Sequence, residues 1–407
     1  MYRKKANILG DKAQYFFVSL IILITANCLS ILTDEFLLGV FLFTFSLFIL
    51  KNKEFDIIVL YVLSAWIAIN IISYGINKTS FSAWAFTGFI VKIFYPYFIL
   101  KLVGVKFFEK LEKIVFILTC ISLPFFAIQI LFPGIINIFN PAFRNITSEE
   151  MLSGRGWYGI IFRIDGSAPF RNAGFMWEPG AFAFMLLLVL LYRILRSGSK
   201  LDFINIIYII ALLTTFSTMA YLGIAVLLFA YAANSKKIGV VFLTIPLAFL
   251  YMGFVSDLDF MFPKIQNYFF TINRSYVPAG QTYLKVNRVA YILFSFRQSL
   301  SWPFGYGIVP SKYMYSEYNR TMLEGVGTIA KILIYWGWIG LVFFITAIYK
   351  LFKILQIKTN RAFLLLAVLI LIIAFFSNPL EKSPVLYSIV FYPFIYKKKP
   401  GLTIKYY

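Results

Sequence analysis

Long apolar runs broken by short polar turns make up most of this chain. They fall at residues 14–32, 36–50, 57–75, 82–100, 114–132, 177–192, 202–216, 219–234, 238–255, 328–349, 362–377 and 384–396. A helix that crosses a membrane needs about 20 predominantly apolar residues, or about 17 at the short end. The pattern therefore predicts an all-α integral membrane protein with about 12 transmembrane helices, in a range of 11 to 13, forming a single polytopic membrane domain over residues 1–407.

The composition excludes an ordinary soluble protein. Hydrophobic residues make up 61% and charged residues 14% of the chain, and the mean hydropathy is +0.82, whereas a soluble domain is about half apolar and about a quarter charged. Histidine is absent, and Cys28 and Cys120 both lie inside predicted membrane helices. Neither a disulfide nor a metal site is expected from these residues, and the sequence predicts no cofactor.

The positive charges follow a membrane topology. With the N-terminus in the cytoplasm, the predicted inside segments hold 23 of the 38 lysines and arginines, and every one of these segments is basic. This positive-inside pattern predicts that both termini are cytoplasmic. It requires residues 201–234 to cross the membrane twice, with a turn from Thr214 to Thr218. Because topology explains the net charge of +21, no nucleic-acid partner is predicted.

Two long connections, residues 133–176 and 256–327, then face outside, and we expect them to carry short helices. They hold basic residues that topology does not require, and most of these are arginines, which suit planar recognition of phosphate or carboxylate. The alternative is a set of solvated charges paired with acidic residues of the same loops. The candidates for substrate binding are Arg163, Arg297 and Arg320, with Arg171 and Arg288 as candidates for the catalytic centre.

Glu178 is the carboxylate best placed for chemistry. It precedes Pro179, and because proline favours the first helical position, the helix should begin there and run to Arg193. That length is about 22 Å, short of a hydrocarbon core of about 30 Å. Glu178 would therefore sit in a recess at the positive end of the helix dipole. The alternative is a structural carboxylate that holds the helix start and pairs with a loop arginine.

Two further features indicate an anion site. Lys92 lies near the middle of a predicted span, where a lysine must reach the interface, pair or line a wet cavity. It would contact an anionic lipid head group or Glu178, or else form a structural ion pair. The run Pro303-Phe304-Gly305-Tyr306-Gly307 predicts a tight turn whose backbone N–H groups suit an anion, which makes Gly305 and Gly307 candidates for substrate binding, although a plain loop turn would look the same.

Three short motifs in order resemble a known family. Arg171-x2-Gly-x3-Glu-Pro precedes one predicted helix, Arg288-x14-Pro-Phe-Gly-Tyr-Gly lies in the second loop, and Tyr335-Trp336-Gly337-Trp338 opens a later helix. In this order and topology the chain resembles the O-antigen polymerase and ligase superfamily, bacterial membrane glycosyltransferases of the GT-C class. The Arg-x10-Gly spacing of Arg163 and Gly174 also resembles that of polymerase loops.

The resemblance implies glycosyl transfer on the external face of the bacterial plasma membrane, from a polyprenyl-diphosphate-linked glycan to a lipid-linked repeat unit. The implied partners are these lipid-linked oligosaccharides, membrane lipids, a chain-length regulator and a flippase. Ligases of the superfamily carry a functional histidine, which this chain lacks, so the polymerase branch is favoured. The alternatives are a ligase-type transferase and a flippase or transporter, which would carry charges along several spans around a central cavity.

Overall fold

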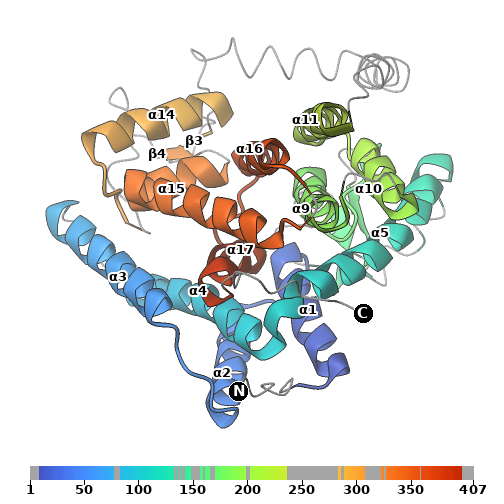
Figure 1. Ribbon diagram of the computed structural model, residues 1–407. Coiled ribbons are helices and arrows are strands. Elements are labelled where there is room, and N and C mark those ends of the chain that lie inside the picture. The colour runs from blue at the N-terminus through green and yellow to red at the C-terminus, as the bar shows by residue number, and fades with distance from the viewer. Residues whose placement is uncertain are drawn as a thin grey trace.

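The computed structural model describes residues 9–77, 83–132, 134, 138, 143–147, 156–158, 161–165, 170–198, 202–235, 283–285, 288–307, 322–324, 327–357 and 359–396. Their elements are α1 Asp11–Ala26, α2 Asp34–Leu50, α3 Ile57–Asn77, α4 Ala83–Val103, η1 Gly104–Lys106, α5 Phe107–Leu131, β1 Gly156–Tyr158, β2 Arg163–Asp165, α9 Pro179–Ser197, α10 Phe203–Thr214, α11 Thr218–Ser235, β3 Tyr283–Lys285, α14 Arg288–Ser301, β4 Met322–Glu324, α15 Thr328–Leu355, α16 Arg361–Ser377 and α17 Pro384–Ile395. Figure 1 shows a bundle of helices, which confirms the all-α prediction.

Each predicted apolar segment overlaps a helix, except residues 238–255, which lie outside the described residues. The helix α1 ends at Ala26, before the predicted end of its segment at residue 32, and α14 lies outside the predicted segments. Within the described part of the chain, four helical stretches are long and apolar enough to cross a membrane: Ile57–Gly75, Phe86–Leu131, Pro179–Ser197 and Thr328–Leu355. Four shorter apolar helices accompany them: Phe203–Thr214, Thr218–Phe229, Arg361–Phe376 and Pro384–Ile395. The helices α10 and α11, with their turn at residues 215–217, confirm that residues 201–234 form two helices.

Helix ends meet in two groups. At one end, the guanidinium of Arg193 near the end of α9 binds the carboxylates of Glu112 and Asp202, with N–O distances of 3.0 and 2.7 Å. At the other end, the backbone N–H of Val385 at the start of α17 donates to the hydroxyl of Thr25 at the end of α1, over 3.3 Å. The first group joins helix ends that the charge pattern predicts inside, and the second joins ends that it predicts outside.

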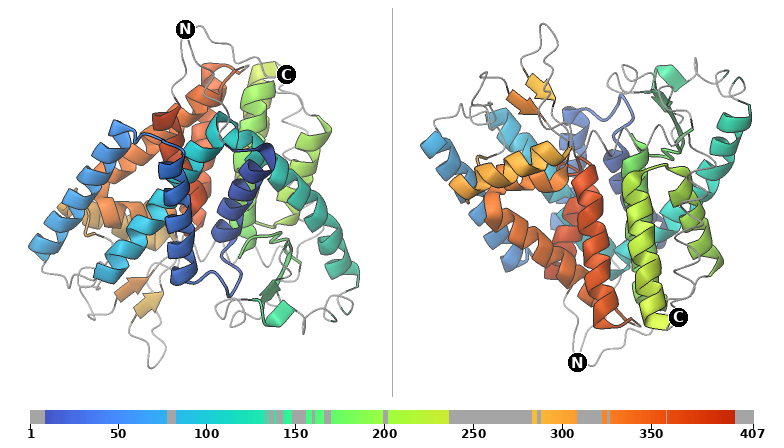
Figure 2. Two further views of the ribbon diagram at one scale, coloured as in Figure 1. Left: turned by 90° about the horizontal axis from the view of Figure 1, so that it is seen from below. Right: turned by 90° about the horizontal axis from the view of Figure 1, so that it is seen from above.

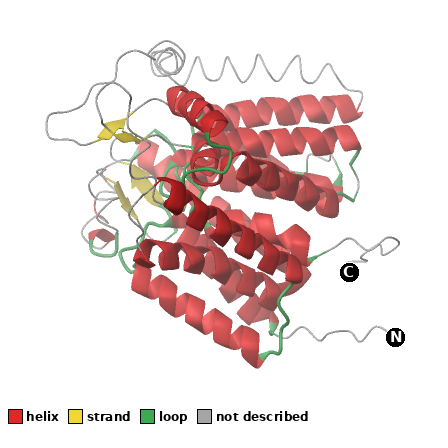
Figure 3. Ribbon diagram, turned by 90° about the vertical axis from the view of Figure 1, so that its left-hand side faces the viewer, coloured by secondary structure: helices red, strands yellow, loops and turns green. Residues whose placement is uncertain are grey.

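Short strands occupy the two long connections, a feature that the sequence pattern did not predict. In the first connection, β1 and β2 form an antiparallel pair, and in the second, β3 and β4 form a parallel pair in which Lys285 and Glu324 are register partners. Figure 3 shows these strands gathered at one end of the helices. The second connection also contains α14, as the prediction of short helices there requires, and this helix lies along α15 (Figure 2).

The helix α15 is broken at Gly337, where φ is 61° and ψ is −157°. A Cβ atom at this position would lie 1.8 Å from the carbonyl oxygen of Pro303. Glycine is therefore required here, because this backbone region is nearly closed to other residues and because another backbone segment passes at contact distance. The break divides α15 into a first segment, residues 328–336, and a longer second segment.

Candidate functional site

The start of α9 has the predicted local structure. Glu178 is extended, with φ −153° and ψ 156°, and Pro179 opens the helix. The Glu178 carbonyl accepts the N–H of Phe182 at 3.1 Å, and the side chain of Glu178 is half-buried. The helix continues to Ser197, beyond the predicted end at Arg193. The helix start is thus confirmed, while the catalytic role of Glu178 stays a prediction.

The segment before Glu178 is fastened to the turn between α10 and α11. The Nε of Arg171 donates to the carbonyl of Thr215 at 3.3 Å, and the side-chain amide of Asn172 donates to the Thr214 hydroxyl at 3.0 Å. The Asn172 carbonyl oxygen in turn accepts the N–H of Gly174 at 2.9 Å. Arg171 therefore contacts the turn between α10 and α11. Its position seven residues before Glu178 in the sequence does not reveal this partner.

Asn378 joins the start of α9 to the start of α15. Its side-chain amide donates to the carbonyl of Gly180 at 3.1 Å. The backbone carbonyl of Asn378 accepts both the N–H and the hydroxyl of Thr328, at 2.9 and 2.6 Å. The Thr328 hydroxyl also accepts the N–H of Leu380 at 2.8 Å. Because Gly180 lies two residues after Glu178, these bonds fix the position of Glu178 relative to α15.

A cluster of charged side chains lies beside this junction. Lys331, in the first turn of α15, contacts the carboxylate of Glu381 at 2.7 Å, and the Glu381 side chain is only 3% exposed. Lys92 contacts the carboxylate of Asp34 at 3.1 Å, which is the ion pair considered as the alternative for Lys92. Lys382 follows Glu381 in the chain, and the charges of Glu381, Lys331, Lys92 and Asp34 act on its ammonium. These groups are three lysines and two carboxylates, so their net charge is positive.

Lys382 is exposed as a whole residue, but desolvation of its ammonium lowers its pKa; the attraction of Glu381 opposes this shift, and repulsion from Lys331 and Lys92 adds to it. A cation that is crowded by other cations is a favourable place for an anion, because an anion relieves the repulsion. The start of α15 contributes in the same direction, since Gly327 supplies no side-chain cap to its N–H groups. We call this group of residues the lysine cluster: Lys92, Lys331 and Lys382 with Asp34 and Glu381.

The position of Lys331 in the sequence is itself a signal of a pairing or a site. It lies in the first turn of an apolar helix, where a charged residue is costly and indicates a pairing or a site. Its partner Glu381 lies 50 residues away in the chain, so sequence alone could not identify the pair.

The strands β3 and β4 place Arg288 beside the same junction. Because the two strands run parallel, the helices that follow them, α14 and α15, begin at the same end of the pair. Tyr291, one turn into α14, shares a buried cluster with Ala330 of α15. Arg288 is the first residue of α14, and its backbone therefore lies near the start of α15. The start of α15 is thus linked to the start of α9 through Asn378 and lies near the start of α14.

The Pro303–Gly307 turn packs against the break in α15. The N–H groups of Tyr306 and Gly307 donate to the carbonyls of Ile334 and Tyr335 at 2.6 and 3.2 Å, and that of Gly305 donates to Trp302 at 3.2 Å. These three N–H groups are satisfied inside the protein, and the predicted contact of the turn with substrate stays a prediction. Gly305 and Gly307 have φ of +78° and +81° and allow close packing against Gly337 and Asn70, which is a structural role for both glycines.

The remaining candidates belong to the two long connections. Arg163 lies in β2, is buried, and donates its backbone N–H to the carbonyl of Gly174 at 2.7 Å. Arg297 is exposed on α14, and Arg320 lies outside the described residues. In the described part of the chain, no three side chains of the metal-binding types gather closely enough to hold a metal ion.

Compared with protein-family models, with curated proteins and with solved structures, the chain has no match.

Proposed function

We propose that this protein polymerises oligosaccharide repeat units carried on polyprenyl diphosphate, by glycosyl transfer at the external face of the bacterial plasma membrane. The observation that carries the proposal is the junction at the starts of α9, α14 and α15. It brings a half-buried carboxylate, Glu178, to the same end of an apolar helix bundle as Arg288 and the lysine cluster. The further parts of the proposal are about 12 spans, cytoplasmic termini and external loops at residues 133–176 and 256–327.

The chemistry of the transfer matches these groups. The acceptor hydroxyl oxygen attacks the anomeric carbon of the donor glycan, and the bond from that carbon to the diphosphate oxygen breaks. The diphosphate leaves with the electron pair, and the cations neutralise its charge in a site of low dielectric constant. The hydroxyl proton passes to the carboxylate of Glu178, which acts as general base. The donor and acceptor are lipids, so a site at the end of apolar helices is accessible to both.

A deletion strain tests the proposal directly. We expect it to accumulate a single repeat unit on the lipid carrier and to lack long polysaccharide, as measured by mass spectrometry of extracted lipids. A carrier with complete repeat units trapped on the cytoplasmic face would instead identify a transporter. Long chains on the carrier that fail to reach a final acceptor would identify a ligase-type transferase.

Complementation with variants tests the site. We expect Glu178→Gln and Arg288→Ala to abolish long chains while the protein remains in the membrane. Lys353→Ala is the matched control, because it removes an exposed cation at the opposite end of α15. Normal chain lengths in both site variants would overturn the assignment of these residues.

A further inference from the structure

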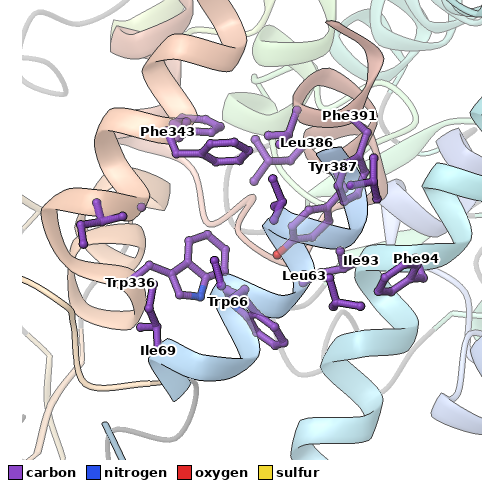
Figure 4. A pocket seen from close by; sticks show the side chains of 17 residues that line it. Leu63, Trp66, Ile69, Ile93, Phe94, Trp336, Phe343, Leu386, Tyr387 and Phe391 are labelled. Atoms are coloured by element: carbon purple, nitrogen blue, oxygen red, sulfur yellow. The ribbon is translucent and has the colours of Figure 1, made fainter. Parts of the chain in front are cut away.

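An apolar cavity of about 170 Å³ lies between α3, α4, α15 and α17. Figure 4 shows its side chains pointing inward from all four helices. Its aromatic lining residues are Trp66, Phe94, Trp336, Phe343, Phe344, Tyr387 and Phe391. No charged side chain is among the described residues that line it. A cavity with this lining stays dry and favours a hydrocarbon over water or a sugar.

The cavity is elongated along α3. Its lining on this helix runs from Val59 to Ile69, a length of about 15 Å at about 1.5 Å per residue. The helix α3 lies at the edge of the bundle (Figure 1), and its lining residue Ala65 is exposed. The cavity is therefore a slot that reaches the outer surface of the apolar bundle. Such a slot suits one extended hydrocarbon chain that enters from the side.

Tyr387 connects the slot to the lysine cluster. Its ring lines the slot, and its hydroxyl donates to the backbone carbonyl of Glu381 at 2.6 Å. The Glu381 carboxylate in turn binds Lys331, and Lys382 is the next residue in the chain. An apolar slot thus ends at a net positive site. This charge pattern matches a lipid whose hydrocarbon chain ends in a phosphate group.

We infer that the slot holds the first part of the prenyl chain of the lipid-linked substrate, with the diphosphate on Lys331 and Lys382. The inference rests on the proposed function. An engineered apolar cavity of about 150 Å³ holds one benzene molecule, so this slot has room for about one isoprene unit. The rest of the chain lies outside the bundle, beside α3. The slot then sets the position of the diphosphate relative to Glu178, which makes Lys331 and Lys382 substrate-binding residues.

The test uses the full-length protein in lipid nanodiscs. The probe is polyprenyl diphosphate with a photoreactive diazirine on the isoprene unit nearest the diphosphate. We expect the label on peptides that contain residues 59–69 of α3 and 336–344 of α15. In Ala65→Trp the indole fills the slot, and the label should fall to background. Ala68→Trp is the matched control, because Ala68 is exposed on the same helix and does not line the slot, so its label should be unchanged.

The phosphate contact is tested separately. We expect Lys382→Gln to weaken probe binding about tenfold, the effect of losing one charge-assisted hydrogen bond. The double variant Lys331→Gln/Glu381→Gln should also weaken binding, and it leaves no buried charge without its partner. Lys353→Gln, at the opposite end of α15, should bind as the unaltered protein does.

Three results would overturn the inference. The first is labelling at other helices, and the second is labelling that survives Ala65→Trp. The third is equal competition by phosphatidylglycerol, which would identify an ordinary lipid site. The proposed function fails independently if the deletion strain makes normal long polysaccharide while the probe still labels the slot. In that case the protein binds a prenyl diphosphate but does not polymerise the glycan.

Discussion

The contact between the Pro303–Gly307 turn and the break in α15 yields a sharp prediction for Gly337→Ala. The added methyl carbon would lie 1.8 Å from the carbonyl oxygen of Pro303, far inside contact distance. The backbone at this position, with φ 61° and ψ −157°, is also nearly restricted to glycine. The variant must therefore either hold a strained backbone or release the turn from α15.

Both outcomes cost free energy, and the cost of releasing the turn sets the expected loss. Retaining the conformation costs about 1–3 kcal/mol in backbone strain, before the clash with Pro303 is counted. Releasing the turn breaks three hydrogen bonds, which join the N–H of Trp338 to Pro303, that of Tyr306 to Ile334 and that of Gly307 to Tyr335. At about 1 kcal/mol for each bond, the loss is about 3 kcal/mol. We therefore expect Gly337→Ala to lower the free energy of unfolding by about 3 kcal/mol.

Thermal unfolding in detergent, followed by tryptophan fluorescence, measures this effect. The midpoint should fall by on the order of 5 °C or more. Gly75→Ala in α3 is the matched control, since nothing lies within 4 Å of its added Cβ, and a helical alanine is more stable than glycine by about 0.5–1 kcal/mol. If Gly337→Ala unfolds at the same temperature as Gly75→Ala, the turn does not depend on the break in α15, and the reasoning is refuted.

Three further predictions concern other contacts. Arg193→Ala should destabilise the fold by about 3–5 kcal/mol because it leaves the buried Glu112 without its cation. Adding Glu112→Gln should restore part of the thermal unfolding midpoint, and no recovery would contradict the pairing of Arg193 with Glu112. Asn378→Ala should lower the free energy of unfolding by about 1–2 kcal/mol, because it removes the side-chain bond to Gly180 that links the starts of α9 and α15. It should also shorten the polysaccharide chains seen on gels, and chains of unchanged length would show that this link does not position the site. The pKa of Lys382 is lowered, so its ammonium loses its proton at a pH below the ordinary value of 10.5. Probe binding to the unaltered protein should therefore decline as the pH rises toward 10.5, whereas binding to Lys382→Arg should stay constant. A flat pH profile for both proteins would contradict the role of Lys382 in binding the phosphate.

Local rules in the sequence were sufficient for two boundaries, the start of α9 and the turn between α10 and α11. The start of α9 follows from Pro179, whose ring fixes a helical φ and excludes helical geometry at Glu178. The turn between α10 and α11 follows from the polar residues 214–218 and from the need to keep Lys200 and Lys236 on one side. These features depend on a few neighbouring residues, and the structure has them where they were predicted, apart from the end of α9.

The arrangement of the site depends on contacts between distant residues, which the sequence does not reveal. The parallel pair β3 and β4 joins segments about 40 residues apart, and its short strands have no distinctive pattern. Arg171 is near Glu178 in the chain, yet the hydrogen bond of its Nε goes to Thr215 on another pair of helices. The glycines of the Pro303–Gly307 turn signalled a tight turn correctly. The sequence could not reveal the packing partner of these glycines, because the turn contacts the helix break at Gly337, about 30 residues further along the chain.

The first segment of α15 relates the parts of the site to one another. At its start, Thr328 is bonded to Asn378, which also holds α9 and hence Glu178. At its end, Trp336 lines the apolar slot next to the break where the Pro303–Gly307 turn docks. Lys331 lies between these two points. A change at the break should therefore shift the slot and the lysine cluster relative to Glu178, even though it removes no charge. It follows that Gly337→Ala should reduce the formation of polysaccharide chains more than its loss of stability alone explains. Comparing the activity per folded protein of Gly337→Ala and Arg193→Ala would separate the loss of stability from the displacement of the site.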